Sequence, residues 1–169
     1  MPDDLQNPEN PKNPDFQTGE CRCARVRFQV DAKPAMTMAC HCTGCQKMTA
    51  SAFSLSALYP ASAFRIVHGE TVLGGLQGAH RHHFCAFCKG WLFTVPAGMD
   101  DWVNVRATLL DNAQGFVPFI ETCTREKLPW VQLPVTHSFG GFPEPEQFHA
   151  LGKAFAQAAD KDSAGQQAW

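Results

Sequence analysis

Eight cysteines are the residues of this chain with the clearest chemical meaning, and seven of them fall into three close groups. Two of the groups are pairs in different halves of the chain, Cys21 with Cys23 and Cys85 with Cys88. Together the pairs supply four thiolates, which are soft ligands that tetrahedral zinc prefers. An ion that joins distant segments also removes the closure entropy of the loop between them. We therefore expect these pairs to form a closed, structural zinc site rather than four separate buried thiols.

The third group is the run Cys40-His41-Cys42-Thr43-Gly44-Cys45. Its three cysteines can wrap one ion from a single turn, and Gly44 permits the tight backbone. Zinc held by three protein ligands keeps a fourth position for water or substrate, so these cysteines are the candidate catalytic residues. Two other interpretations stay open. Cys123 or His41 could close the site as a fourth ligand and make it structural, or the cluster could be a metal-free, redox-active set of thiols.

The composition sets limits on the partners. The chain has 169 residues, 44% of them hydrophobic and 18% charged, which is typical of one globular domain. A net charge of −2 and a pI of about 6.4 provide no positive field that would attract nucleic acid or an anionic membrane. The first residues lack the regions of a signal peptide, and no stretch approaches the ~20 apolar residues of a membrane span. We expect a cytoplasmic protein with reduced thiols and no nucleic-acid or membrane partner.

Short segments with alternating apolar and polar residues predict the strands that must position the cysteines. In residues 25–30, for example, Val26, Phe28 and Val30 share one face. Gly and Pro residues separate this segment from the similar ones that follow. Many short strands with close turns predict a mainly β domain of antiparallel strands. The further strands are expected at residues 52–59, 64–68, 71–73, 81–85, 91–95, 102–109 and 116–122.

The two ends of the chain are expected to differ from its body. The first residues contain four prolines with repeated Asn and Asp, a composition that predicts a disordered tail. Phe148, Leu151 and Phe155 recur at helical spacing after Pro145, so a C-terminal helix should pack on the strands through this stripe. The expected divisions are a tail at residues 1–17, a zinc-binding domain at 18–159 and a frayed end at 160–169.

Three motifs carry a family resemblance: Gly-Glu-Cys-Arg-Cys at 19–23, Cys-His-Cys-Thr-Gly-Cys at 40–45 and Phe-Cys-Ala-Phe-Cys at 84–88. In this order they resemble the glutathione-dependent formaldehyde-activating enzyme family, which includes centromere-protein-V-like members. The resemblance spans about residues 18–131. It implies a β-tent fold in which the first and third cysteine groups hold a structural zinc and the middle group holds a catalytic zinc.

The activity implied by the resemblance is the addition of glutathione to formaldehyde, which forms S-(hydroxymethyl)glutathione. This is carbon–sulfur lyase chemistry in the reverse sense. We accordingly expect two zinc ions per chain and a small thiol and a small aldehyde as partners. The alternative is a zinc-ribbon-like binding module in which both ions are structural and no reaction occurs. An open coordination position would favour the enzyme, and a fourth protein ligand would favour the module.

Three positions depart from the family's pattern. Lys89 and Ala50 stand where a glycine is usual, and Glu121 stands where many relatives have a histidine. The first two departures leave the zinc ligands intact, whereas the third bears on the substrate pocket. Glu121 and His41 are the candidates for a general base.

The remaining polar and aromatic candidates are less specific. His80, His82 and His83 lie in a basic stretch, and such a stretch is more typical of a solvated face than of a set of metal ligands. His82 could still contact the ligands of a zinc ion without binding the ion itself. Cys123 lies in a strand-like run and is expected to be a buried thiol. The candidate partners for substrate carboxylates are Lys47, Arg65 and Arg81, and the expected core or pocket-wall tryptophans are Trp91, Trp102 and Trp130.

Overall fold

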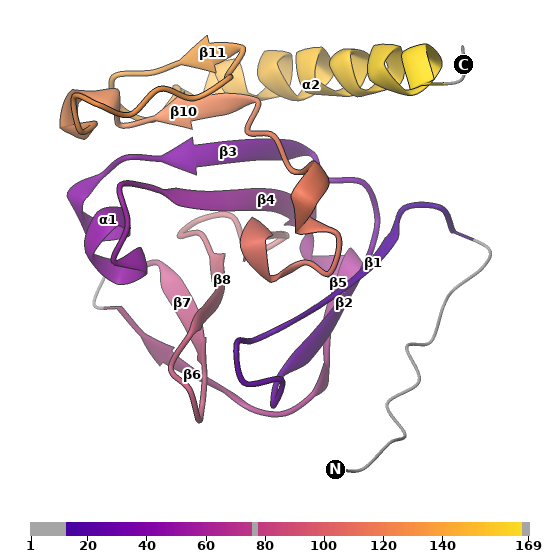
Figure 1. Cartoon of the computed structure of the whole chain (residues 1–169), viewed down its shortest axis with the longest axis vertical. Helices are drawn as coiled ribbons and strands as arrows, with labels where there is room; N and C mark the ends of the chain where they lie inside the picture. Colours follow the sequence, from indigo (N-terminus) through magenta and orange to yellow (C-terminus); the bar gives the residue numbers. More distant parts are fainter. Residues whose placement is uncertain (1–12, 76–77, 167–169) are drawn as a thin grey trace.

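The structure, a computed structural model, describes residues 13–75 and 78–166, and its strands form two sheets (Figure 1). The strands are β1 (Phe16–Glu20), β2 (Arg27–Asp31), β3 (Met36–Cys40), β4 (Ser54–Pro60), β5 (Phe64–His68), β6 (Thr71–Gly74), β7 (Arg81–Cys85), β8 (Trp91–Val95), β9 (Trp102–Arg106), β10 (Ile120–Thr122) and β11 (His137–Ser138). The smaller sheet has the order β1-β2-β5, and the larger has the order β11-β10-β3-β4-β9-β8-β7-β6. The predicted mainly β fold is confirmed.

Most neighbouring strands are antiparallel, as predicted, but β10 is an exception. It pairs in parallel with both β3 and β11. The pairing with β3 places Thr122 opposite Cys40, so a segment from the later part of the chain reaches the middle cysteine group.

Two helices complete the fold. The short α1 (Thr43–Thr49) follows β3 directly, and α2 (Pro145–Gln166) lies along the larger sheet next to β10 and β11 (Figure 1). Leu151 and Phe155 pack with Phe119 and Ile120 in one apolar cluster, as predicted, whereas Phe148 is not part of this cluster. None of the helices in the described part of the chain has the length and apolarity that a membrane crossing requires.

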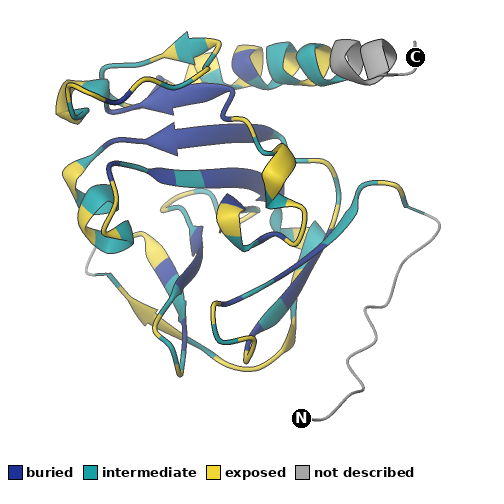
Figure 2. Ribbon diagram, in the orientation of Figure 1, coloured by how far each residue is buried: buried dark blue, intermediate teal, exposed yellow. Residues whose placement is uncertain are grey.

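The predicted boundaries differ from the structure at both ends and in the middle. Strand β1 begins at Phe16, inside the predicted tail, most of which lies outside the described residues. Helix α2 continues to Gln166, inside the segment expected to fray. Strand β3 was not predicted because every one of its residues is buried, so it shows no alternation (Figure 2). The turn expected after Cys42 is helix α1.

The main core lies beneath the first and last cysteine groups. Phe28, Tyr59 and Leu92 are almost fully buried in it, and Cys21 and Cys85 belong to the same cluster of buried residues. The turns that carry these two cysteines are therefore anchored on well-packed side chains, which fixes where their sulfurs lie.

Candidate metal centres

The cysteines of the first and last groups lie close enough to bind one ion. Their four sulfurs are all within 4.8 Å of one another, with 3.4 Å between Cys21 and Cys23 and 3.8 Å between Cys23 and Cys85. Tetrahedral zinc with bonds of about 2.3 Å places its sulfur ligands about 3.8 Å apart. None of the eight cysteines forms a disulfide. The donor set therefore fits one zinc ion.

Two tight turns hold these sulfurs in place. Cys21 follows β1, and its Sγ accepts a hydrogen bond from the backbone N–H of Val26 (3.3 Å). Cys85 ends β7, and its Sγ accepts a hydrogen bond from the backbone N–H of Cys88 (3.5 Å). Hydrogen bonds to sulfur favour the thiolate, which is the form that binds metal. The turns thus place the sulfurs and also stabilise them as thiolates.

The middle group forms a second cluster, at the point where β3 passes into α1. Cys40 is the last residue of β3, Cys42 is the N-cap of α1, and Cys45 lies in its first turn. Their sulfurs are also within 4.8 Å of one another. The Sγ of Cys42 accepts a hydrogen bond from the backbone N–H of Cys45 (3.3 Å). This cluster brings three thiol ligands to one point.

The three sulfurs of this cluster shift one another's pKa values. A hydrogen bond from Cys45 lowers the pKa of Cys40 to about 5, although burial opposes the change. The same pairing raises the pKa of Cys45. A divalent cation that replaced the thiol protons would stabilise all three sulfurs as thiolates. The donor set therefore fits a zinc ion with three protein ligands.

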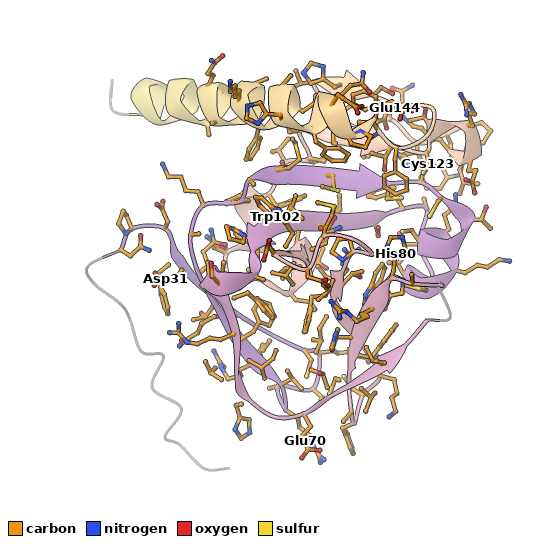
Figure 3. The ribbon with its side chains drawn as sticks, turned by 180° about the vertical axis from the view of Figure 1, so that it is seen from behind. Asp31, Glu70, His80, Trp102, Cys123 and Glu144 are labelled. Atoms are coloured by element: carbon orange, nitrogen blue, oxygen red, sulfur yellow. The ribbon has the colours of Figure 1, made fainter. Side chains whose placement is uncertain are left out.

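Cys123 lies next to this cluster but outside it. It follows β10, beside the end of β3 that carries Cys40 (Figure 3). Burial, together with the neighbouring Cys40 and Cys42, raises the pKa of Cys123 to about 12. Among the described residues, the group of sulfurs within 4.8 Å of one another contains only Cys40, Cys42 and Cys45. The prediction of a buried thiol is confirmed.

A cleft of about 400 Å³ adjoins the cluster. Ser54 lines the cleft and pairs with Cys40 across β3 and β4. Arg106 also lines it and interacts electrostatically with Cys45 and Cys40. The other lining residues are Cys21, Arg22, Met48, Thr49, Ser51, Phe53, Leu55, Lys89, Gly90, Trp91, Leu92, Thr108 and Leu109. The cleft thus includes Cys21 of the four-cysteine cluster in its lining, and Ser54 and Arg106 connect it to the three-cysteine cluster.

The match to a family model includes the same cysteine groups. A model of the glutathione-dependent formaldehyde-activating enzyme family matches residues 16–126, more than half of the chain and all three cysteine groups. The chain belongs to this family. A solved structure of a Rhodobacter sphaeroides protein is similar at 22% sequence identity and a TM-score of 0.48, and the similarity covers 62% of this chain and 99% of that one. A comparison with curated proteins found no match.

Two departures from the pattern of the formaldehyde-activating family lie at left-handed backbone positions. Ala50 ends α1 with a φ of 49°, and Lys89 follows the last cysteine pair with a φ of 57°. Glycine adopts this conformation freely, whereas another residue costs roughly 1–2 kcal/mol there. The turn at Lys89 is nevertheless kept, since its backbone N–H donates to the carbonyl of Cys85 (3.1 Å). The substitutions strain the turns without displacing the ligands.

The third departure, Glu121, belongs to a buried hydrogen-bond network. Its Oε2 lies 2.9 Å from Nε2 of His41, and Lys127 donates to both carboxylate oxygens at 2.8 and 3.1 Å. The hydroxyl of Ser138 donates to Oε1 (2.9 Å). Burial would raise the pKa of Glu121, but these hydrogen bonds outweigh it and hold the pKa below its ordinary value. His41 is 0% exposed and Glu121 is 5% exposed, so the pair supports the loop between Cys40 and Cys42 from beneath.

Glu121→Gln tests this supporting role. The change keeps the shape of the side chain but removes the charge that Lys127 and His41 face, so we expect the free energy of unfolding at pH 7 to fall by about 1–3 kcal/mol. Because the folded-state pKa is lowered, this stabilisation is complete above the unfolded-state pKa of about 4.3 and disappears as the pH falls below it. Chemical denaturation of both proteins between pH 6 and pH 3 should show their difference shrinking below about pH 4.3. A pH–rate profile that loses its acid limb in the variant would instead identify Glu121 as a general base.

Other positions singled out from the sequence have different environments. His82 is 7% exposed and not part of a solvated face, and its Nδ1 lies 2.7 Å from the hydroxyl of Thr94. Burial lowers the pKa of His82 to about 4, so it is neutral at pH 7. Trp91 is buried and lines the cleft, whereas Trp130 is 72% exposed and is not a core residue.

The cations proposed for substrate carboxylates lie outside the cleft. Arg65 donates to Gln29, Arg81 forms an ion pair with Asp100, and Lys47 is exposed on α1. The cations that do line the cleft are Arg22, Lys89 and Arg106. Their sequence neighbourhoods give no common signal, because the turn after β1, the turn after β7 and the end of β9 meet only in the folded chain.

Proposed function

We propose that this protein is an enzyme that adds a small thiol, such as glutathione, to formaldehyde or another small aldehyde. A carbon–sulfur bond forms, and the thiol proton ends on the former carbonyl oxygen, so the reaction needs no oxidant or reductant. The observation that carries the proposal is the three-cysteine cluster beside a cleft, in a chain of the formaldehyde-activating family. The four-cysteine cluster serves as the structural site.

Each residue of the cluster has a role in this proposal. A zinc ion bound by Cys40, Cys42 and Cys45 would supply a coordination position in which a substrate thiol becomes a thiolate. The three cysteines bind as thiolates themselves, which leaves the site with a net negative charge. Such a site suits the delivery of a thiolate better than the activation of water. The buried pair of His41 and Glu121 keeps the loop between the ligands rigid.

The rival function is a zinc module without catalysis, and one observation favours it. The thiol of Cys123 is buried beside Cys40, so a small shift would bring a fourth sulfur to the second cluster. Four thiolates would close the site to substrate. The two functions therefore predict different results when Cys123 is removed. An open site keeps its zinc and its activity, whereas a closed site loses its fourth ligand.

Metal content and exchange NMR test the proposal. Protein purified without chelator should contain nearly two zinc equivalents per chain, and it should accelerate exchange between formaldehyde and S-(hydroxymethyl)glutathione above the uncatalysed rate. One equivalent or fewer, with all thiols open to titration, would contradict the two-site assignment. Two equivalents without acceleration by any thiol would contradict the enzyme and favour the module.

A further inference from the structure

Arg106, the last residue of β9, is buried without a carboxylate partner. It is 6% exposed, and within residues 13–75 and 78–166 no carboxylate lies within 4.0 Å of its guanidinium. One terminal nitrogen donates to the backbone carbonyl of Asn104 (3.2 Å), whereas Nε has no hydrogen-bond partner in this part of the chain. A buried charge is costly unless a group of opposite charge pairs with it. The position of Arg106 therefore requires a negative group nearby.

The pairing of three strands places Arg106 on the same face of the larger sheet as the three-cysteine cluster. Cys40 pairs with Ser54 across β3 and β4, and Ser56 pairs with Arg106 across β4 and β9. Residues that pair directly lie on one face of a sheet, as do residues two apart along one strand. The side chains of Cys40 and Arg106 therefore lie on one face, on either side of β4. This placement explains why Arg106 interacts electrostatically with Cys45 and Cys40.

A neutral network holds the guanidinium in this position. The guanidinium carbon lies 3.9 Å from the ring centroid of Trp91. The indole N–H of Trp91 donates to the hydroxyl of Thr94 (3.2 Å), and this hydroxyl lies 2.7 Å from Nδ1 of His82. Burial lowers the pKa of His82 to about 4, so the network is neutral at pH 7. Burial lowers the pKa of Arg106 only to about 10, because Cys45 and Cys40 oppose the change, so Arg106 is a fixed positive charge.

The charge of the three-cysteine cluster is opposite to that of Arg106. A zinc ion with three thiolates has one net negative charge, and a thiolate in the fourth position adds a second. We propose that Arg106 is the buried counter-charge of this cluster and a positioning residue for its metal. It stabilises the zinc-bound thiolates through the low-dielectric interior, and most strongly the state with four sulfurs. The proposal rests on zinc at the three-cysteine cluster and goes beyond the proposed reaction, in which Arg106 has no assigned role.

Arg106→Met tests the counter-charge through zinc affinity, without any reaction. The flexible Met side chain fills the buried space but has no charge. We expect the three-cysteine cluster to bind zinc about 10- to 100-fold more weakly at pH 7, in competition with a chromophoric chelator, while the four-cysteine cluster is unaffected. Arg106→Lys, which keeps the charge, should recover most of the affinity. Lys47→Met is the matched control, because it removes a solvent-exposed cation from α1 and should change the affinity less than about twofold.

Three outcomes of this measurement decide the proposal. Unchanged zinc affinity in Arg106→Met would overturn it and leave the enzyme assignment standing. Equal losses in Arg106→Met and Arg106→Lys would also overturn it, because Arg106 would then act through its shape and not its charge. If circular dichroism shows that Arg106→Met does not fold, Arg106→Gln, which keeps hydrogen-bond donors without the charge, should show the same loss.

A neutral thiol tests the state with four sulfurs. 2-Mercaptoethanol has no carboxylate, so only its thiolate can respond to the charge of Arg106. In protein with Co²⁺ in place of zinc, a fourth sulfur ligand increases the sulfur-to-cobalt charge-transfer absorption, which reports the affinity. We expect Arg106→Met to bind this thiol about 10-fold or more weakly than the wild type and Arg106→Lys, and equal binding by all three would overturn the role of Arg106 in this state. If no thiol binds to the wild type but its zinc affinity depends on Arg106, the counter-charge is supported and the proposed reaction is contradicted.

Discussion

Cys42→Ala is expected to reduce the formation of S-(hydroxymethyl)glutathione to the uncatalysed rate, the largest change in activity that we predict. Cys42 is both a candidate ligand and the N-cap of α1, so its loss leaves two thiols and frees the first turn of the helix. Zinc bound by two thiols would no longer be held at the cleft with a defined open position. Exchange NMR measures the rate, and metal analysis should show the loss of one zinc equivalent per chain.

The control for this variant is Cys123→Ala. The thiol of Cys123 is buried beside the cluster but outside the group of three sulfurs. If the second site is open, Cys123→Ala should keep both zinc equivalents and an activity within about twofold of the wild type. Loss of the second zinc in this variant would show that Cys123 is a ligand, and the module without catalysis would then be the better assignment.

Cys85→Ser is expected to prevent folding or to remove most of the stability of the domain. Structural zinc sites contribute about 10–16 kcal/mol of apparent binding free energy, whereas a whole domain is stable by only about 5–15 kcal/mol. The sulfur of Cys85 is buried in the main core and lies 3.8 Å from that of Cys23, so the change breaks the link between the β1 and β7 turns. Thermal unfolding monitored by circular dichroism measures the effect.

The comparison for Cys85→Ser is the thermal transition of Cys42→Ala. Cys42 joins residues that are near in sequence, and its cluster lies outside the main core, so its loss should lower the melting temperature much less. Equal destabilisation by the two changes would mean that both clusters serve the structure. A folded, zinc-retaining Cys85→Ser protein would contradict the assignment of the four-cysteine cluster as structural.

Several strands were predictable from the sequence, and others were not. β5, β7 and β8 have the predicted bounds. Gly69 follows β5, Cys85 ends β7, and Gly90 and Pro96 flank β8. β3 lies between β4 and β10 and is buried throughout, so it has no polar face to reveal its period. The parallel pairing of β10 with β3 depends on the path of the intervening chain, which local patterns do not record.

The sequence by itself indicated the three close cysteine groups, because thiols at short spacing meet within one turn wherever that turn lies. The fold then brings the pair Cys21 and Cys23 within 4.8 Å of the pair Cys85 and Cys88. The sequence also determined the family, whose motifs are these same cysteines. Only the tertiary structure decided what surrounds them. The contact between His41 and Glu121 exists because β10 pairs with β3, and it buried two side chains that looked like general bases. The charge of the cleft likewise comes from Arg22, Lys89 and Arg106, which three separate segments bring together. Burial and charge at a site are sums over neighbours in space, and neighbours in space are fixed only when the chain has folded.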